Sequence, residues 1–331
     1  MIEPLLKIED LHTWFFTTEG VGRAVDGVDF EVRRGETFGL VGESGCGKSM
    51  TSLSILKLVP SPPGRIVSGQ IRFKGNDLLP FSEKKMRQIR GNQISLIFQE
   101  PMTALNPVFT VGEQIAEMYR IHRGMNRRES FEAAVDMMEK VKIPAARKRA
   151  REYPHQLSGG MRQRIMIAMA LACDPDLLIA DEPTTALDVT IQAQILALLD
   201  NLKQRTNAAV ILITHDLGVI AETADHVAVM YAGQIVEEAP VDQLFSNPLH
   251  PYTQGLLRSI PQWNAADRQK LHVIHGAVPT PTRFPGGCRF HPRCEQRKPL
   301  CEQQPCDIVT CGDAHSVRCF LYHNSTSTTD S

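Results

Sequence analysis

The sequence predicts an α/β fold: a parallel core sheet with an antiparallel β region on its N-terminal side, a helical insertion, and a small cysteine-bearing C-terminal domain. Two observations predict the sheet: short apolar runs that each end in polar side chains, and a glycine-rich loop between such a run and a helix. Parallel sheets bind ligands at the carboxyl ends of their strands, where these polar residues fall. The third observation concerns the cysteines, because six of the eight lie between residues 288 and 319.

The composition is that of an ordinary globular protein, and it limits the classes of function. With 331 residues, 42% of them hydrophobic and 22% charged, the chain is long enough for one large or two moderate domains. A net charge of -1 argues against a general nucleic-acid binder, so we expect no nucleic acid partner. The longest apolar run, 165–173, covers less than half of the roughly 20 residues that a membrane-spanning helix needs. The first ten residues carry acids where a signal peptide carries basic residues, which predicts a protein of the cytosol.

The loop at residues 42–49 fits the P-loop pattern at every required position. It follows the apolar run 38–41 and precedes a predicted helix over 50–58. Its glycines let backbone amides face a triphosphate, and the helix that follows directs its positive end at the same anion. We expect Lys48 to reach the β- and γ-phosphates of ATP and Ser49 to bind Mg²⁺; the alternative is a glycine-rich turn that binds nothing. The residues expected to bind nucleotide here are Gly42, Glu43, Ser44, Gly45, Cys46, Gly47, Lys48, Ser49, Met50 and Thr51.

The N-terminal stretch from Leu5 to Phe16 predicts a strand that ends in three adjacent aromatic residues, Trp14, Phe15 and Phe16. One of these rings has the π-face needed to stack on adenine. Aromatic residues at a strand end more often belong to the core. The residues alone leave both interpretations open.

A polar amide, Gln99, follows the short buried strand predicted at 94–98. At the end of a strand in the sheet that carries the P-loop, it is placed to reach Mg²⁺ or the attacking water; a surface glutamine is the alternative. From Val111 to Arg151 the pattern then becomes helical and charged. We therefore expect a helical insertion at about residues 100–160.

A second glycine-containing turn, Ser158-Gly159-Gly160, precedes an apolar helix predicted to run through Ala172. Glycines before a helix leave its first amides open to an anion, and the Ser158 hydroxyl adds a donor. The P-loop already accounts for the chain's own triphosphate, so we expect this turn to meet the γ-phosphate of ATP bound to another subunit. A simple helix cap is the alternative.

Two further strand ends carry polar residues. Asp181 and Glu182 follow the apolar run 177–180, where a P-loop fold places the aspartate that orients Mg²⁺ and where a glutamate can polarise the attacking water. Asp188 opens the next predicted helix, over 191–202. His215 follows the strand predicted at 210–213, which delivers it toward the same phosphate.

With these motifs in this order, residues 5–260 resemble the ATP-binding-cassette (ABC) ATPases. The resemblance implies a nucleotide-binding domain over 1–260 in which Phe15 stacks on adenine and Asp188 belongs to the nucleotide site. It identifies Gln99 as the Q-loop residue, 158–161 as the signature, Asp181 as the Walker B acid, Glu182 as the catalytic base and His215 as the switch histidine. Two ATP molecules are then expected between two such subunits arranged head to tail.

A narrower resemblance covers nearly the whole chain. The stretches 98–107 (FQEPMTALNP), 250–257 (HPYTQGLL) and 287–294 (GCRFHPRC) are similar to the dipeptide and oligopeptide permease ATPases. Membership implies a peripheral protein on the cytoplasmic face of the inner membrane. Its partners would be a second ATPase subunit, identical or paralogous, two transmembrane permease subunits and, through them, an extracellular or periplasmic peptide-binding protein. Some relatives carry nickel or other solutes, and the substrate is set by those other chains.

Another class remains as the alternative, a soluble ABC-type ATPase that acts on nucleic acid or ribosomes. Repair-type members carry a long coiled coil between Q-loop and signature, and translation-type members carry two cassettes. Only 57 residues separate Gln99 from Leu157, and one cassette is present. A pure iron–sulfur redox protein would leave the complete ATPase set unexplained.

The C-terminal region, 261–331, needs a chemistry of its own. Disulfides are disfavoured in a reducing cytosol, and the cysteine spacing matches neither common zinc pattern nor the ferredoxin runs. Related ATPases carry a four-cysteine [4Fe–4S] site in this region, and that resemblance implies Cys288, Cys294, Cys301 and Cys319 as ligands. Cys306 and Cys311 are extra and compete for the fourth position.

Overall fold

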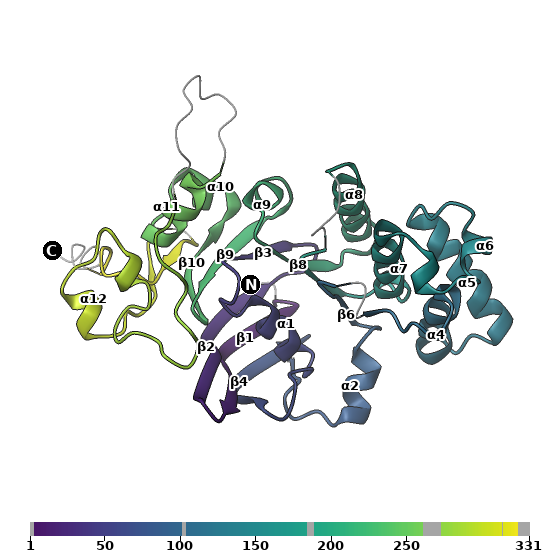
Figure 1. Ribbon diagram of the computed structural model, residues 1–331, viewed down its shortest axis with the longest axis horizontal. Coiled ribbons are helices and arrows are strands. Elements are labelled where there is room, and N and C mark those ends of the chain that lie inside the picture. Colours follow the sequence, from purple (N-terminus) through teal and green to yellow (C-terminus); the bar gives the residue numbers. More distant parts are fainter. Residues whose placement is uncertain (1–2, 101–103, 184–188, 261–272, 313, 324–331) are drawn as a thin grey trace, which may run out of the picture. The chain divides into compact units, whose positions relative to one another are not determined.

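The computed structural model describes residues 3–100, 104–183, 189–260, 273–312 and 314–323. Contacts within the chain divide it into two compact units. The P-loop unit is made of residues 6–31, 37–72 and 214–331, and the insertion unit of residues 1–5, 32–36 and 73–213. Figure 1 labels most of the helices and strands of both units. In the described part of the chain, no helix combines the length and apolar character that crossing a bilayer requires.

An N-terminal sheet in the P-loop unit contains neighbouring strands in the order β2-β1-β4. Along the start of β1, buried Leu6 and Ile8 alternate with partly exposed residues, the period-two pattern of a strand with one face in the core. This sheet corresponds to the β region predicted on the N-terminal side. Its strands are β1 (Leu6–Thr17), β2 (Gly20–Val32) and β4 (Gly64–Phe73).

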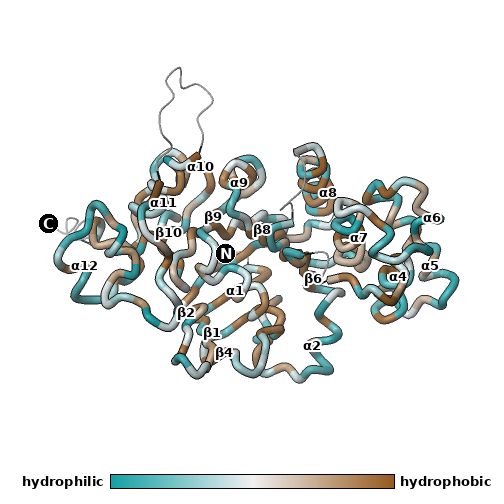
Figure 2. The backbone as a smooth tube through the Cα atoms, in the orientation of Figure 1, coloured by the Kyte–Doolittle hydropathy of each residue, from teal (hydrophilic) through white to brown (hydrophobic). Residues whose placement is uncertain are grey.

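The second sheet of the P-loop unit holds the strand that leads into the glycine-rich loop. All five residues of β3 (Thr37–Val41) are buried, as expected for a strand covered on both faces. It pairs in parallel with β9 (His226–Tyr231), whose hydrophobic residues show as brown bands in Figure 2. β9 pairs antiparallel with β10 (Gln234–Pro240). The helices of this unit are α1 (Lys48–Ile55), α9 (Leu217–Thr223), α10 (Val241–Ser246) and α11 (Pro251–Arg258).

The insertion unit contains three parallel strands, with β7 between β6 and β8. Ile97 of β6 pairs in register with Ala180 of β7, so residues that follow these strands emerge at the same level. The strands are β6 (Ile94–Ile97), β7 (Leu177–Asp181) and β8 (Ala209–Thr214), with the short β5 (Asn76–Asp77) earlier in the chain. The helices are α2 (Glu83–Ile89), α4 (Val111–Arg123), α5 (Arg127–Lys140), α6 (Ala146–Arg149), α7 (Gly159–Leu171) and α8 (Val189–Thr206), with a 3₁₀ turn, η1, at Pro154–Gln156.

The predicted helical insertion is present: α4, α5, α6 and α7 lie between β6 and β7 in the chain, and Figure 1 shows them close together. Local signals set their ends. Asn126 accepts hydrogen bonds from the amides of Arg128 and Glu129, and the Glu129 carboxylate accepts from the Asn126 amide, a capping box that starts α5. α4 ends at Gly124, which has a φ of 66°.

Two element boundaries differ from the prediction. The helix after the P-loop ends at Ile55, before the predicted residue 58, because Lys57 takes a left-handed conformation with φ 52°. The sequence also predicts a strand over Gly69–Phe73, ahead of a turn at Gly75-Asn76, but this strand begins at Gly64. Periodicity did not reveal this longer strand, because its first half carries exposed and partly exposed residues with no regular apolar face.

The described C-terminal residues continue the sheet that carries the P-loop strand. β12 (Ser316–Val317) pairs with β10, and β11 (Val309–Thr310) pairs with β12. Glu237 of β10 is fully buried, accepts hydrogen bonds from the amides of Leu249 and His250, and lies 2.8 Å from Nε2 of His315. These partners satisfy a carboxylate that would otherwise be costly to bury. The remaining elements here are η2 (His291–Arg293) and α12 (Leu300–Gln303).

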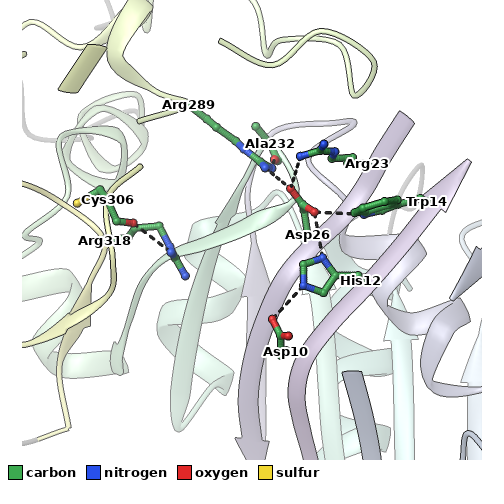
Figure 3. A network of polar contacts seen from close by, with 9 residues as sticks. All are labelled: Asp10, His12, Trp14, Arg23, Asp26, Ala232, Arg289, Cys306 and Arg318. Carbon is green, nitrogen blue, oxygen red and sulfur yellow. Dashed lines mark hydrogen bonds and ion pairs between the residues drawn. The ribbon is translucent and has the colours of Figure 1, made fainter. Parts of the chain in front are cut away.

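Arg289 makes a second connection between the C-terminal residues and the rest of the P-loop unit. Its guanidinium binds the Asp26 carboxylate of β2 and donates to the carbonyl of Ala232 at 2.5 Å (Figure 3). Burial opposes the charge on Asp26, but hydrogen bonds from Arg289, His12 and Trp14 outweigh it and lower the pKa of that carboxyl. The C-terminal residues are thereby held to two strands of the same unit, β2 and β10.

Candidate functional site

Two glycines of the predicted P-loop are required by close approach of the protein's own backbone. A Cβ at Gly42 would lie 2.2 Å from the carbonyl oxygen of Met230, and one at Gly47 would lie 2.4 Å from that of Ala24. Gly45 differs, since its φ is 81° but a Cβ there would meet no atom within 4 Å. The loop therefore packs closely against backbone carbonyls at Gly42 and Gly47, whereas space remains beside Gly45.

The side chain of Lys48 folds back along this loop. Only 6% of Lys48 is exposed, and its Nζ donates to the carbonyl oxygens of Gly42 at 2.8 Å and Glu43 at 3.0 Å. These bonds hold the ammonium group over the loop. Cys46 is fully buried beside Gly42, and burial raises the pKa of its thiol.

The first turn of α1 presents backbone amides without a side-chain cap. Gly47 is its N-cap residue, and neither a capping side chain nor an acidic residue occupies this end. The first intrahelical bond joins the amide of Thr51 to the carbonyl of Gly47 at 2.9 Å, and Thr51 is 1% exposed. Thr51 therefore belongs to the body of the helix, whereas Lys48, Ser49 and Met50 precede its first bond.

The three adjacent aromatic residues have different surroundings. Trp14 donates to Asp26 and lies under the guanidinium of Arg23. Phe16 is 39% exposed, and Arg65 lies 4.2 Å from the centre of its ring. Phe15 is half-buried beside Gly64, where an added Cβ would lie 2.8 Å from the Phe15 ring.

In the insertion unit, the structure brings Gln99 and Glu182 together. Each lies two residues beyond the paired residues Ile97 and Ala180, and Nε2 of Gln99 donates to Oε2 of Glu182 at 3.0 Å. Asp181, the last residue of β7, is 7% exposed. The predicted Q-loop residue and the predicted base therefore meet at the ends of neighbouring strands.

The backbone at Glu182 is unusual. Its φ is 48°, a left-handed conformation that costs a non-glycine residue of the order of 1 kcal/mol. The Glu182 amide donates to the carbonyl of Ile213 at 2.8 Å, which holds this conformation in place. Strained conformations of this kind occur at functional sites.

The predicted signature residues form the exposed start of α7. Ser158 is the N-cap residue, and its Oγ accepts from the amide of Met161 at 3.4 Å, as the capping alternative predicts. A Cβ at Gly159 or Gly160 would meet nothing within 4 Å, and neither residue has a positive φ. Nothing in the described part of this chain therefore requires glycine at these positions.

Sequence reasoning gave Gln163 no role, but the structure gives it a definite contact. The side chain is 3% exposed, and its Nε2 donates to the carbonyl of Pro183 at 2.6 Å. It ties α7 to the turn directly after Glu182. The signal available in the sequence was a glutamine at the start of a predicted apolar helix. A sequence pattern does not show which group such an amide binds.

The remaining predicted site residues are placed as follows. His215 is exposed and follows β8, and it belongs to the P-loop unit, as the P-loop itself does. Gln99, Ser158, Asp181 and Glu182 belong to the insertion unit. Asp188 lies outside the described residues.

Five of the C-terminal cysteines influence one another electrostatically. Burial raises the pKa of the thiols of Cys288, Cys294, Cys306 and Cys319. The pKa rises to about 12 for Cys306 and to about 11 for Cys319. Charges on neighbouring cysteines, including Cys301, add to the effect of burial. Cys311 is apart from this set, since Glu237 is the charge that raises the pKa of its thiol after burial.

These cysteines do not form a metal-binding geometry. Within the ranges that the structure describes, which include all eight cysteines, no group of three or more His, Cys, Asp or Glu side chains is placed to hold a metal ion, and no disulfide links them. The predicted [4Fe–4S] site is therefore not supported by the arrangement of these residues, although thiols of suitable chemistry gather in one region.

Two family models match the chain. The model of the ABC transporter family matches residues 25–185, which include the P-loop, Gln99, the signature and the Asp181-Glu182 pair. The model of the oligopeptide/dipeptide transporter C-terminal region matches residues 236–301, which include Arg293 and the first three of the predicted cluster cysteines.

Similar proteins extend over nearly the whole chain. The oligopeptide transport ATP-binding protein AppD of Bacillus subtilis is 54% identical over 318 residues, 96% of this chain and 97% of that protein. A probable peptide ABC transporter ATP-binding protein, y4tR of Sinorhizobium fredii, is 52% identical over 96% of this chain and 94% of its own length.

Among solved structures, a dimeric post-hydrolysis state of the ATP-binding cassette MJ0796, bound to ADP and Pi, matches with a TM-score of 0.65 and 26% identity, over 71% of this chain and 98% of that one. The P-loop, the paired strand ends and the matches along the full length agree. The chain therefore belongs to the ATP-binding proteins of the ABC transporter family, in its oligopeptide/dipeptide group.

Proposed function

We propose that this protein binds and hydrolyses ATP to drive the uptake of dipeptides or oligopeptides through membrane permease subunits. The observation that carries the proposal is the 54% identity to an oligopeptide transport ATP-binding protein over 97% of that protein's length. It extends through the C-terminal region, where a cassette that served another process would have no reason to match. The ATPase chemistry follows from family membership.

Within the ATP site, each predicted residue has a role. The loop from Gly42 to Ser49, with the amides at the start of α1, wraps the phosphates, and Lys48 turns from its carbonyl partners toward the β- and γ-phosphates. Phe15 stacks on adenine. Ser49, Gln99 and Asp181 would hold Mg²⁺, which would supply positive charge to the phosphate oxygens.

Hydrolysis itself falls to Glu182. Its carboxylate accepts the proton of the attacking water, Gln99 orients that water through its hydrogen bond to Glu182, and His215 stabilises the γ-phosphate as it leaves. The strained backbone at Glu182 supports this role, because such conformations occur at functional sites and this one is held by Ile213.

A second ATPase subunit, either a copy or a paralogue, completes each site. Ser158, Gly159 and Gly160 would contact the γ-phosphate bound by the partner, with Asp188 nearby in the nucleotide site. The open surface at Gly159 and Gly160 supports this arrangement, because the chain itself gives no reason for glycine there. Closure on ATP and opening after hydrolysis would then move the attached permease.

The assembly implied by this function is peripheral. Two transmembrane permease subunits would hold the ATPase pair at the cytoplasmic face of the inner membrane, and an extracellular or periplasmic peptide-binding protein would deliver substrate to them. Intact-complex mass spectrometry of affinity-purified protein from membranes tests this directly. We expect two ATPase chains together with two permease chains; recovery with ribosomes or nucleic acid alone would refute the importer.

The C-terminal region 261–331 is the proposed site of a [4Fe–4S] cluster. Cys288, Cys294, Cys301 and Cys319 are the proposed ligands. Burial and charges on neighbouring cysteines raise the thiol pKa of Cys288, Cys294 and Cys319, and Cys301 is buried. A bound cluster would cross-link a segment with few large apolar residues, and loading it would require the four cysteines to draw together as thiolates. Protein purified without oxygen should be brown, Cys288→Ser should bleach it and Cys311→Ser should not. Colourless protein with stoichiometric zinc would refute the cluster.

A further inference from the structure

The P-loop is tied to the C-terminal region by an ion pair. Both guanidinium nitrogens of Arg293 bind the carboxylate of Glu43, Nη1 to Oε2 at 2.6 Å and Nη2 to Oε1 at 3.0 Å. Glu43 is the second residue of the loop, and Arg293 lies 250 residues later in the chain. Both belong to the P-loop unit. A bidentate pair of this kind fixes orientation as well as charge.

Arg293 is held in place independently of Glu43. Its Nε donates to the carbonyl of His275 at 3.0 Å and its Nη2 to that of Ile274 at 3.2 Å. Only 5% of its side chain is exposed, and the hydrogen bond to Glu43 raises its pKa above the ordinary value. The guanidinium is therefore a fixed positive charge beside the second residue of the loop.

Glu43 is also held through its backbone. Its amide donates to the hydroxyl of Tyr252 at 2.8 Å, and its carbonyl accepts from Nζ of Lys48 at 3.0 Å. Tyr252 is fully buried on α11. Both external partners of Glu43 thus come from the chain beyond residue 250, outside the nucleotide-binding motifs.

A carboxylate in a phosphate-binding loop is an electrostatic problem. ATP brings several negative charges to this loop, and an unpaired glutamate within about 8 Å of them would reduce the affinity by roughly tenfold or more at the effective dielectric of a protein surface. Arg293 neutralises Glu43 and, through the bidentate contact, fixes the position of its carboxylate.

We propose that Arg293 is a positioning residue for ATP: by pairing with Glu43 it sets the conformation and the charge of the P-loop, so the C-terminal region controls nucleotide affinity. The proposal rests on the proposed ATP site at this loop. It does not depend on any metal cluster, because the contacts that carry it join side chains and backbone of this chain alone.

A double-mutant cycle in the full-length chain tests it, with the dissociation constant of a fluorescent ATP analogue and the melting temperature as readouts. Arg293→Ala should weaken binding by roughly tenfold, because Glu43 is left unpaired beside the phosphates. Glu43→Gln should bind somewhat tighter than wild type, because Arg293 then faces the phosphates unopposed. The double variant should recover most of the affinity lost in Arg293→Ala.

Two control variants test whether Arg293 positions the P-loop for ATP or only stabilises the fold. Arg289→Ala removes the neighbouring arginine that binds Asp26, so it should lower the melting temperature as Arg293→Ala does while ATP affinity changes less than twofold. Arg293→Lys keeps the charge, loses the bidentate geometry and should fall between wild type and Arg293→Ala. If Glu43→Gln fails to rescue Arg293→Ala, or Arg289→Ala weakens ATP binding equally, the positioning role is wrong. Wild-type protein that binds no ATP would instead refute the proposed function on which it rests.

Discussion

The side-chain amide of Gln99 donates a hydrogen bond to the carboxylate of Glu182, with 3.0 Å between Nε2 and Oε2. They lie 83 positions apart in the chain, yet each follows by two positions one member of the pair Ile97 and Ala180, which are in register on adjacent strands. The contact therefore joins the residue proposed to orient water to the residue proposed to accept its proton.

Replacing Glu182 by Gln should abolish turnover while nucleotide binding survives. The amide is nearly the same size but does not accept the proton of water, so we expect phosphate release to fall by roughly 10²- to 10⁴-fold. ATP should still bind and drive pairing of the ATPase subunits, as gel filtration would report. Glu139→Gln, on the exposed side of α5, is the matched control and should hydrolyse ATP normally. Near-normal turnover of Glu182→Gln would exclude it as the base.

Lys48→Ala should act on binding itself. The ammonium group lies over the loop and would contribute a charge-assisted contact with the phosphates, so its removal should raise the dissociation constant of ATP by roughly 10- to 100-fold. Calorimetric titration measures this, with Lys84→Ala on the exposed surface of α2 as control. Equal affinities for the two variants would contradict the assignment of this loop.

Gly159→Ala should raise the stability of the chain but weaken the ATP-dependent pairing of the ATPase subunits. An added methyl group meets open space and suits a helix, so α7 and the isolated chain should gain up to about 1 kcal/mol of stability. The same methyl group would stand between α7 and the partner's γ-phosphate, so ATP-dependent pairing should weaken. A variant that melts higher and still pairs with normal affinity would show that the glycine does not face a partner.

Acid should destabilise the protein through His250. Burial lowers the pKa of this histidine to about 3, and its Nδ1 accepts from the Tyr252 amide, so the ring is neutral when folded. In the unfolded chain this histidine takes up a proton below a pKa of about 6.5, whereas in the folded chain it stays neutral down to about pH 3. The contribution of His250 to the free energy of unfolding is therefore complete above pH 6.5 and is lost as the pH falls toward 3.

His250→Asn keeps a cap for α11 without a titrating ring. Between pH 7.5 and 5.5 the unfolding free energy of wild type should drop by about 1.4 kcal/mol more than that of the variant, because the other titrating groups, including Glu237 and His315 nearby, are common to both. Urea unfolding at the two pH values gives both numbers. Parallel pH dependence in the two proteins would mean that His250 is not the acid-sensitive group.

The sequence predicted well whatever depends on short local patterns. A P-loop, a capped helix and polar residues at strand ends each occupy a few consecutive residues, so Gly42 to Ser49, Gln99 and Glu182 were recognisable before their contacts were known. The sequence was less informative about why a given position needs its residue type. Gly42 and Gly47 were assigned to phosphate binding, whereas the structure also shows them packed against the carbonyls of Met230 and Ala24.

Long-range contacts of the C-terminal region were not predictable from pattern. The strands Val309–Thr310 and Ser316–Val317 are too short to show a period of two, so their addition to β10 gave no signal. The pair formed by Glu43 and Arg293 is equally invisible, because a lone glutamate and a lone arginine 250 residues apart carry no motif. The cysteines drew attention to a separate region, although its described residues share one compact unit with the P-loop.

Uptake of a labelled peptide by the reconstituted transporter tests the central claim most directly. Proteoliposomes that contain this chain, its partner ATPase and the permease subunits should accumulate a labelled di- or oligopeptide only when ATP and the peptide-binding protein are supplied. The same complex with Glu182→Gln in this chain should lose most of that uptake. Uptake that is independent of ATP, or a complete complex that hydrolyses ATP and moves no peptide, would contradict the account.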